Sequence, residues 1–420
     1  MSVVPSYRKK KSLQQLRGSY ILLLLIILYL TAALLPFFVS IPRVPGMGFY
    51  FGILTVLIIF SGVEHLNHRI MFPIFGFALV GGLYYVTDNY SAGHDHEDLF
   101  LAFHVLFVIT SMYLVTIHKR CFSFKFEKLL FNFIFFFTAI TSITSIYGLF
   151  KYPDAARFMI GADDLAQVLK YMRLNIGSYR ILTFFSVIGP TFIYSYFKLK
   201  KSIYFLAIGL LASFAVIMGQ ITGIILMMLI CILFYIIAYY CKSIRGFYTK
   251  IIITIVLLSF SNALLLFFIE IILPLIEGFK SIIPKVKELQ LLLTDGLSVT
   301  ASEGLTNTLG YYERLEKSWS GFLSSPFTGG EDSGAHHYWV DYLAENGLFG
   351  ITLWILFFSG FWKLIQATFN EQARIMIFIN LLIFIIFGLI KNIVLAQQAV
   401  FVFFVFPFLV MKLTENKNDI

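Results

Sequence analysis

Residues 8–40 read RKKKSLQQLRGSYILLLLIILYLTAALLPFFVS, a basic segment followed directly by an apolar run. The run that begins at Tyr20 is too long for the core of a signal peptide, and no small-residue cleavage site precedes Pro36. An apolar helix of about 20 residues is long enough to cross the hydrocarbon core of a bilayer. We therefore expect an uncleaved membrane span at residues 20–40 with its basic flank in the cytoplasm.

The composition extends this expectation to the whole chain. Of its 420 residues, 59% are hydrophobic and 13% are charged, whereas soluble proteins are about 45–50% apolar and about 25% charged. So few charges cannot cover so much apolar surface in water, which excludes a cytosolic enzyme, a disordered chain and a secreted disulfide scaffold. The expected fold class is an all-α polytopic membrane protein. No disulfide is expected, because the three cysteines (Cys121, Cys231 and Cys241) fall in or beside spans or in a basic loop.

Twelve stretches are candidate spans. They are residues 20–40, 49–63, 70–86, 99–117, 129–150, 180–197, 203–218, 223–241, 251–273, 347–362, 375–390 and 398–411. With both termini in the cytoplasm, the termini and the inner loops hold 20 of the 32 Lys and Arg residues but 5 of the 23 Asp and Glu residues. This bias is the one that cytoplasmic loops show. It also accounts for the net charge of +9, so no nucleic-acid partner is expected.

This topology divides the chain into five parts. They are a basic cytoplasmic segment (1–19), spans one to nine (20–273), a large outer loop with short helices (274–345), spans ten to twelve (346–412) and a cytoplasmic tail (413–420). A loop as long as 274–345 is more typical of a functional element than of a connector.

The end of this loop holds the most informative pattern, which runs SPFTGG (325–330), GAHHYW (334–339) and DYLAENGLFG (341–350). The pattern predicts a turn and then a helix from His336 onward, with Tyr338, Tyr342 and Glu345 near one face. A histidine at the outer mouth of a bundle can act as a base, a proton shuttle or a phosphate partner. A helix cap with aromatic interface anchors remains the alternative from the residues alone.

Residues 326–350 resemble the O-antigen polymerase and O-antigen ligase family, which are bacterial membrane glycosyltransferases of the GT-C type. In the family pattern, a pair such as HN or HS stands nine residues before the Glu of an E-x-G-x-x-G ending. Here His336 and His337 fall on the pair, and Glu345, Gly347 and Gly350 fall on the ending. The resemblance extends more weakly to the topology of many spans and one large outer loop.

The family's arginines match less well. The arginine that usually opens a helix before the loop's proline would fall at Tyr311, whereas the nearest one here is Arg314, and residues 218–223 lack the family's mid-chain arginine. Arg173 and Arg180, in and just after the outer loop at 151–179, are the expected substitutes. Arginine can bind phosphate through two parallel hydrogen bonds. Snorkelling contact with lipid headgroups is the alternative.

The resemblance implies a multi-pass enzyme of the bacterial inner membrane with its active site facing the periplasm. Its donor would be a glycan on undecaprenyl diphosphate, and its acceptor a second glycan or the lipid A-core. His336 would orient or deprotonate the acceptor hydroxyl, and substrate would be bound by Arg180, Arg314, Arg173, His337 and Glu345. No metal and no cofactor are expected, and a chain-length regulator is a further candidate partner.

Three functions compete at this point. Polymerisation of lipid-linked repeat units into O-antigen or a related surface polysaccharide is the preferred one, and ligation of the finished polymer to the lipid A-core is the alternative within the family. A transporter or flippase of lipid-linked sugars is the alternative from another class, because twelve spans with both ends inside is a common transporter arrangement. The scarcity of charges in the spans and the long outer loop favour the enzyme.

Overall fold

The computed structural model describes residues 27, 31, 35–39, 124–161, 164–259, 306–330, 334, 337–390, 398 and 401–414, and these parts contain helices and no strand. The described elements are α2 (Pro36–Val39), α6 (Phe124–Lys151), α7 (Ala155–Gly161), α8 (Leu165–Arg173), α9 (Tyr179–Leu199), α10 (Ile203–Met218), α11 (Thr222–Tyr239), α12 (Ile244–Ser259), α16 (Thr306–Ser324), α17 (Tyr338–Thr368), α18 (Glu371–Ile390), the π-helical turn η2 (Phe401–Val405) and α20 (Phe406–Thr414). The spans predicted at 49–63, 70–86 and 99–117 lie outside the described residues.

The described helices confirm the class of a helical membrane protein. Three helical stretches are long and apolar enough to cross a bilayer, namely residues 128–151 of α6, α17 and α18. The shorter apolar helices include α10, which coincides with the span predicted at 203–218. The number of spans and their orientation stay predictions.

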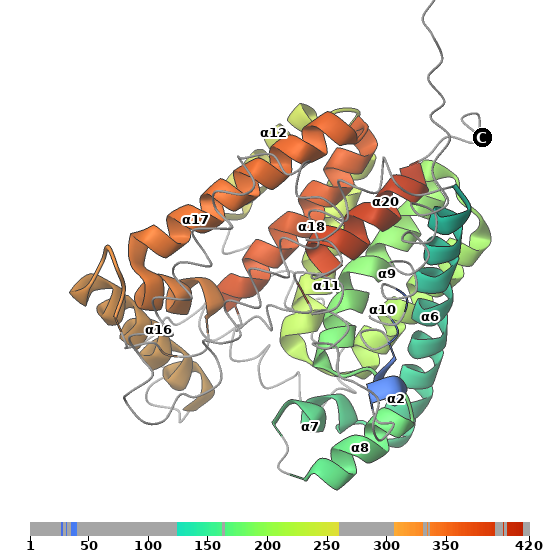
Figure 1. Ribbon diagram of the computed structural model, residues 1–420, viewed down its shortest axis with the longest axis horizontal. Helices are drawn as coiled ribbons and strands as arrows, with labels where there is room; N and C mark the ends of the chain where they lie inside the picture. The colour runs from blue at the N-terminus through green and yellow to red at the C-terminus, as the bar shows by residue number, and fades with distance from the viewer. Residues whose placement is uncertain are drawn as a thin grey trace, which may run out of the picture.

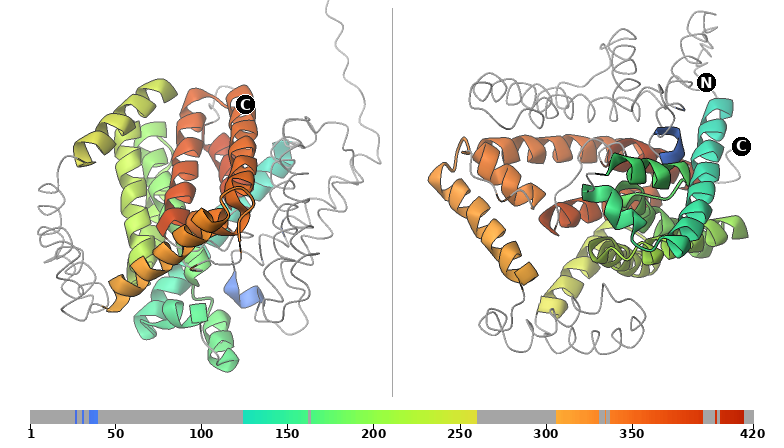
Figure 2. Two further views of the ribbon diagram at one scale, coloured as in Figure 1. Left: turned by 90° about the vertical axis from the view of Figure 1, so that its left-hand side faces the viewer. Right: turned by 90° about the horizontal axis from the view of Figure 1, so that it is seen from below.

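The helices form two packed groups that meet along α18. On one side α10 packs against both α6 and α9, and α11 packs against α9; on the other side α17 and α20 pack against α18, which also contacts α11 (Figure 1). The helix α16, within the predicted outer loop, lies against the beginning of α17 and far from α6 (Figure 2). It has 19 residues, so it is longer than the short helices expected there.

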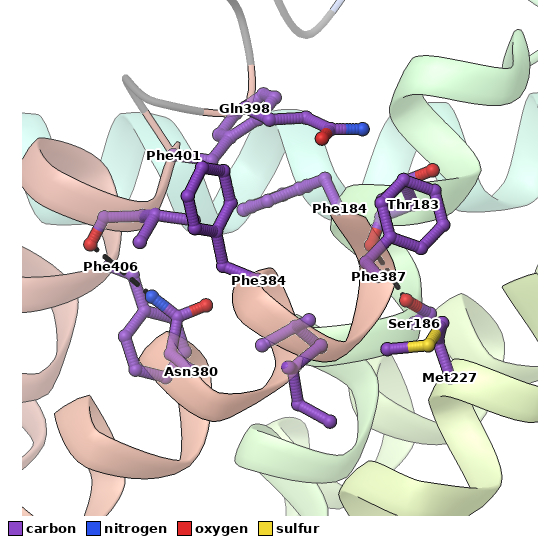
Figure 3. Close-up of a pocket in the computed structure, with 13 residues that line it drawn as sticks. Thr183, Phe184, Ser186, Met227, Asn380, Phe384, Phe387, Gln398, Phe401 and Phe406 are labelled. Carbon is purple, nitrogen blue, oxygen red and sulfur yellow. Dashed lines mark hydrogen bonds between the residues drawn. The ribbon is translucent and has the colours of Figure 1, made fainter. Parts of the chain in front are cut away.

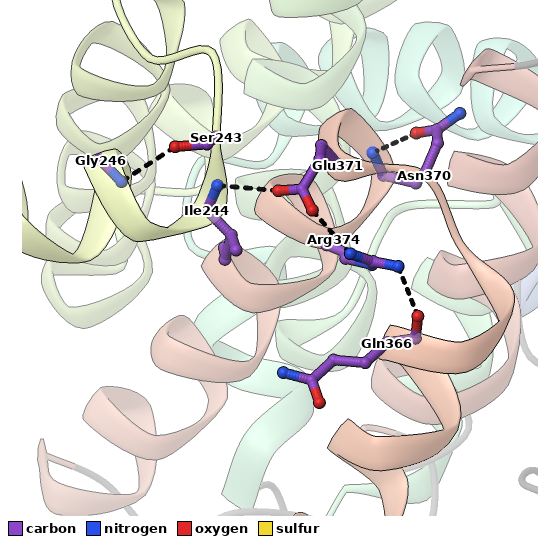
Figure 4. Close-up of polar contacts among 8 residues, drawn as sticks. Ser243, Ile244, Gly246, Gln366, Asn370, Glu371 and Arg374 are labelled. Atoms are coloured by element: carbon purple, nitrogen blue, oxygen red, sulfur yellow. Dashed lines mark hydrogen bonds and ion pairs between the residues drawn. The ribbon is translucent and has the colours of Figure 1, made fainter.

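Polar contacts join three helices at the end of the bundle where α18 begins. The Glu371 carboxylate accepts a hydrogen bond from the backbone N–H of Ile244 at 3.0 Å and pairs with Arg374 at 2.6 Å (Figure 4). The Arg374 guanidinium also donates to the carbonyl of Gln366. One carboxylate therefore connects the first turns of α12 and α18, and its arginine partner connects them to α17. This is the predicted cytoplasmic end.

Two glycines allow the closest helix approach in the first group. A Cβ on Gly209 of α10 would lie 2.8 Å from the carbonyl oxygen of Gly189 of α9, and a Cβ on Gly189 would lie 2.5 Å from Ser213 Oγ. Small residues are common where membrane helices pack backbone to backbone, because they permit extensive van der Waals contact.

Replacement of one of these glycines should destabilise the bundle. Gly209→Ala places a methyl group against the backbone of α9, and we expect it to cost about 1–3 kcal/mol of stability and to lower the melting temperature in detergent. Gly246→Ala is the control, since its Cβ would meet only Ser243 Oγ at 3.4 Å. Equal melting temperatures for the two variants would contradict the close approach of α9 and α10.

Candidate functional site

The helix α17 is interrupted at Gly347, inside the E-x-G-x-x-G ending. Gly347 has φ 60° and ψ −163°, which is not a helical conformation. A side chain would be strained at this φ, and its Cβ would lie 2.5 Å from the carbonyl carbon and oxygen of Phe327. The break therefore separates a loop helix (338–346) from the membrane-spanning part of α17, at the position where the sequence predicts the tenth span to begin.

The break is closed by the turn at residues 325–330. A break removes helical hydrogen bonds, and the exposed backbone groups need other partners. The turn supplies them through three backbone hydrogen bonds: Gly330 N to Ala344 O (2.8 Å), Leu348 N to Pro326 O (2.9 Å) and Phe349 N to Phe327 O (3.2 Å). Gly329 has φ 78°, and its Cβ would lie 2.1 Å from the carbonyl oxygen of Glu345. The turn and the break thus form one unit in which two glycines permit the contact.

A buried carboxylate fixes the start of the loop helix. Asp341 is 5% exposed, and its two oxygens accept hydrogen bonds from the Ser318 hydroxyl and, at 2.6 Å, from the backbone N–H of His337. Ser318, on α16, in turn accepts from the backbone N–H of Gly334 at 2.7 Å. Since a buried carboxylate is costly unless it is hydrogen-bonded, this network holds α16, the segment before α17 and the loop helix together.

The His337 ring connects the loop helix to the far end of α18. It is fully buried, and its Nδ1 lies 3.0 Å from the carbonyl oxygen of Leu389. A carbonyl oxygen only accepts, so Nδ1 carries the proton in this contact. Trp339 also donates to α18, from Nε1 to the carbonyl of Ile385 at 2.8 Å. These two hydrogen bonds hold the loop helix against the last turns of α18.

The first turn of α9 reaches the same end of α18. The ring of Tyr179 lies 6.1 Å from that of Phe387, centroid to centroid, and Phe387 is two residues before the Leu389 that contacts His337. Arg180 follows Tyr179 and is exposed. The structure therefore brings the helix start that carries Arg180 and the buried His337 to one end of one helix.

Asn175 anchors the loop between Arg173 and Arg180. It adopts a left-handed conformation with φ 53°. Its Nδ2 donates to Thr144 Oγ1 at 2.9 Å, and its Oδ1 accepts from the backbone N–H of Phe37 at 3.3 Å. Asparagine adopts the left-handed conformation more readily than most residues, and here its side chain is also held by hydrogen bonds to distant parts of the chain. Asn175 thus ties this loop to α6 and α2.

The remaining predicted site residues are less closely gathered. Arg173 is exposed at the last position of α8, Arg314 is exposed on α16 one turn before Ser318, and Glu345 is half-buried on the loop helix. His336 lies outside the described residues. Within the described ranges, His, Cys, Asp and Glu side chains form no cluster of three that could hold a metal ion.

Sequence reasoning missed Ser318 and Asp341. The available signal was an aspartate among aromatic residues four positions after His337, because an acidic group in so apolar a segment needs hydrogen-bond donors. The identity of the donor on α16 could not be read from local sequence, since Ser318 is 23 residues away.

Comparison of the chain with protein-family models, with curated proteins and with solved structures finds no match.

Two adjacent glycines provide a matched test of the interlocked turn. We expect Gly329→Ala to destabilise the protein strongly, because its Cβ would overlap the backbone of residue 345 and its φ is positive. Gly330→Ala should be tolerated, since the nearest atom to its Cβ is Ser325 Cβ at 3.9 Å. Melting temperature and the yield of monodisperse protein in detergent measure the difference; a Gly330→Ala variant as unstable as Gly329→Ala would disprove the arrangement.

The Asp341 network makes a separate prediction. Ser318→Ala removes a donor to a buried carboxylate and an acceptor for the backbone of Gly334, so we expect a loss of about 1–3 kcal/mol. Ser320→Ala, on the same helix, should have little effect, because that hydroxyl is exposed and donates only to the carbonyl of Lys317. Thermal unfolding of both variants is the measurement, and similar stability losses would argue against the network.

Proposed function

We propose that this chain is a bacterial inner-membrane glycosyltransferase that polymerises undecaprenyl-diphosphate-linked repeat units on the periplasmic side. The observation that supports this proposal is the unit formed by residues 325–330 and 337–350. The described parts of the segment that carries the family resemblance are joined by backbone hydrogen bonds, and they contact the end of α18 beside the helix start that carries Arg180.

In the proposed reaction, the arginines bind the donor diphosphate and a separate set of residues acts on the acceptor. Transfer of the glycan releases a diphosphate, whose negative charge grows as the bond to the sugar breaks. Arg180 and Arg314 have exposed side chains, and we assign them the binding of this diphosphate, because guanidinium groups stabilise phosphate charge through paired hydrogen bonds. Arg173, at the end of α8, would add positive charge to the loop that leads to Arg180.

The two histidines then receive different roles. His337 is buried, and its Nδ1 donates a hydrogen bond to the Leu389 carbonyl. We therefore assign His337 a positioning role, which is to hold the backbone next to His336 in place. His336 is the proposed base that takes the proton from the acceptor hydroxyl. Glu345 lies on the loop helix, and its backbone is next to Gly329; from there it would help to bind the acceptor.

Ligation of finished polymer to the lipid A-core uses the same donor and remains the alternative activity. A transporter or flippase of lipid-linked sugars is the alternative from another class. The surface glycans of a deletion strain separate these three functions.

A gel ladder of surface glycans tests the proposal. In a deletion strain complemented with His336→Ala or Arg180→Ala, we expect core that carries a single repeat and a missing ladder. Loss of a general base slows transfer by about 10²–10⁴-fold, and loss of Arg180 leaves the charge on the departing diphosphate less stabilised. Arg245→Ala, an exposed arginine at the opposite end of the bundle, should leave the ladder unchanged when expression is matched.

Other patterns have definite meanings in this experiment. Bare core with polymer retained on the carrier lipid would identify a ligase instead. A normal ladder from well-expressed His336→Ala protein would remove His336 from the mechanism. Bare core with single repeat units and no polymer on the carrier lipid, together with movement of labelled lipid-linked sugar by the purified protein, would favour a flippase. Unchanged glycans in the deletion strain itself would contradict the proposal.

A further inference from the structure

A partly open pocket lies between α9, α11, α18 and the segment made of Gln398, η2 and the start of α20 (Figure 3); the space not filled by atoms, counted together with its open mouth, is about 470 Å³. Five phenylalanines line it, namely Phe184, Phe384, Phe387, Phe401 and Phe406, and the described residues that line it include no charged side chain. Its walls come from the first half of α9 and the second half of α18, so it lies toward the predicted outer end of the bundle.

The amide of Gln398 is the exception in this apolar wall. Gln398 is 4% exposed, and neither its Nε2 nor its Oε1 has a hydrogen-bond partner among the described residues. Its amide extends along the edge of the pocket toward the side formed by Phe184 and Thr183 (Figure 3). Buried amides are almost always hydrogen-bonded, so an unsatisfied one indicates a missing partner.

Each of the other polar side chains that line the pocket makes at least one hydrogen bond within the protein. Asn380 Nδ2 donates to the carbonyl of Val402 at 3.2 Å, and the Ser186 hydroxyl donates to the carbonyl of Thr183 at 2.7 Å. Among the side chains that line the pocket, Gln398 is the one whose buried nitrogen and oxygen both lack a hydrogen-bond partner among the described residues. An amide offers a donor and an acceptor at once, and a hydroxyl group is the simplest complement to both.

We propose that this pocket binds a neutral lipid alcohol, with the apolar chain among the phenylalanines and the hydroxyl on the Gln398 amide. A charged ligand is disfavoured, because a charge taken out of water without an ionic partner is costly. The hydroxyl can belong to a prenyl alcohol or to a monoacylglycerol, which share this chemistry. The proposal concerns binding only, so it stands independently of the glycosyltransferase assignment.

Binding to the delipidated full-length protein tests this site. The probes are geranylgeraniol, monoolein and squalene, which is a prenyl hydrocarbon without a hydroxyl, and native mass spectrometry gives the affinity of each. We expect at least one of the two alcohols to bind the wild type more tightly than squalene. Gln398→Leu should weaken binding of that alcohol by about tenfold, the equivalent of one hydrogen bond, and leave squalene binding unchanged.

Two further variants complete the design. Gln366→Leu is the matched control, because this glutamine is exposed on α17 and outside the pocket, and its alcohol binding should equal that of the wild type. Val402→Phe adds volume to the wall and should weaken all three probes, which keeps the site testable if Gln398→Leu does not fold.

The outcomes separate clearly. Tighter binding of geranylgeraniol than of monoolein would support the proposal with a prenyl ligand, and the reverse order would support it with an acyl ligand. Equal alcohol affinities for wild type and Gln398→Leu would overturn it, as would squalene binding as tight as that of the alcohols. A wild type that binds none of the three probes would also overturn it, and a more stable Gln398→Leu would then mean that water alone satisfies the amide.

Discussion

The break in α17 at Gly347 is the constraint on which the outer part of this structure depends. A helix that ran unbroken from residue 338 would satisfy its own backbone and would leave the turn at 325–330 without partners. The left-handed glycine instead opens backbone groups that only a closely approaching chain can reach. Because Gly329 lacks a side chain as well, the turn enters the break and makes three backbone hydrogen bonds there. The spacing of the glycines in this segment is thus a requirement of backbone geometry.

Buried polar groups then orient the elements around this unit. Asp341 holds α16 through Ser318, and His337 holds α18 through the Leu389 carbonyl. Each contact satisfies a group that would be costly to leave unpaired away from water. Such contacts select one arrangement among the many that apolar packing alone would permit, since Leu, Ile and Phe surfaces pack in many registers. Asp341 and His337 thus fix how α16, the loop helix and α18 are placed relative to one another.

The fold was predictable from the sequence where the signal is local. Apolar length alone places α10 at residues 203–218 and identifies α18, because crossing a bilayer demands a minimum run of apolar residues. Helix ends were less predictable: α17 continues to Thr368, beyond the span predicted to end at residue 362, because polar residues continue the helix outside the apolar core. The predicted spans before residue 124 lie outside the described residues, apart from a few positions within 27–39.

The site was predictable only in part, for a physical reason. The composition of the loop end singled out residues 325–350, but which groups meet there depends on contacts between distant parts of the chain. Ser318 and Asp341 illustrate this, as does the pairing of the turn with the break. The shared position of Arg180 and His337 at one end of α18 follows from helix packing, which no local pattern encodes. The catalytic role of His336 stays a prediction.

The length of α18 has a consequence for the arrangement of the elements at its two ends. The helix has 20 residues, which corresponds to about 30 Å of α-helix, and this equals the thickness of the hydrocarbon core. Glu371 ties its first turn to α12, and the Leu389 carbonyl ties its last turn to His337. The length of α18 therefore sets the distance between its contact with α12 at one end and its contact with the loop helix at the other. One inserted residue would raise the far end by about 1.5 Å and rotate the Leu389 carbonyl by about 100° away from the imidazole. The length of α18 and its helical phase are therefore both constrained by the contacts at its two ends.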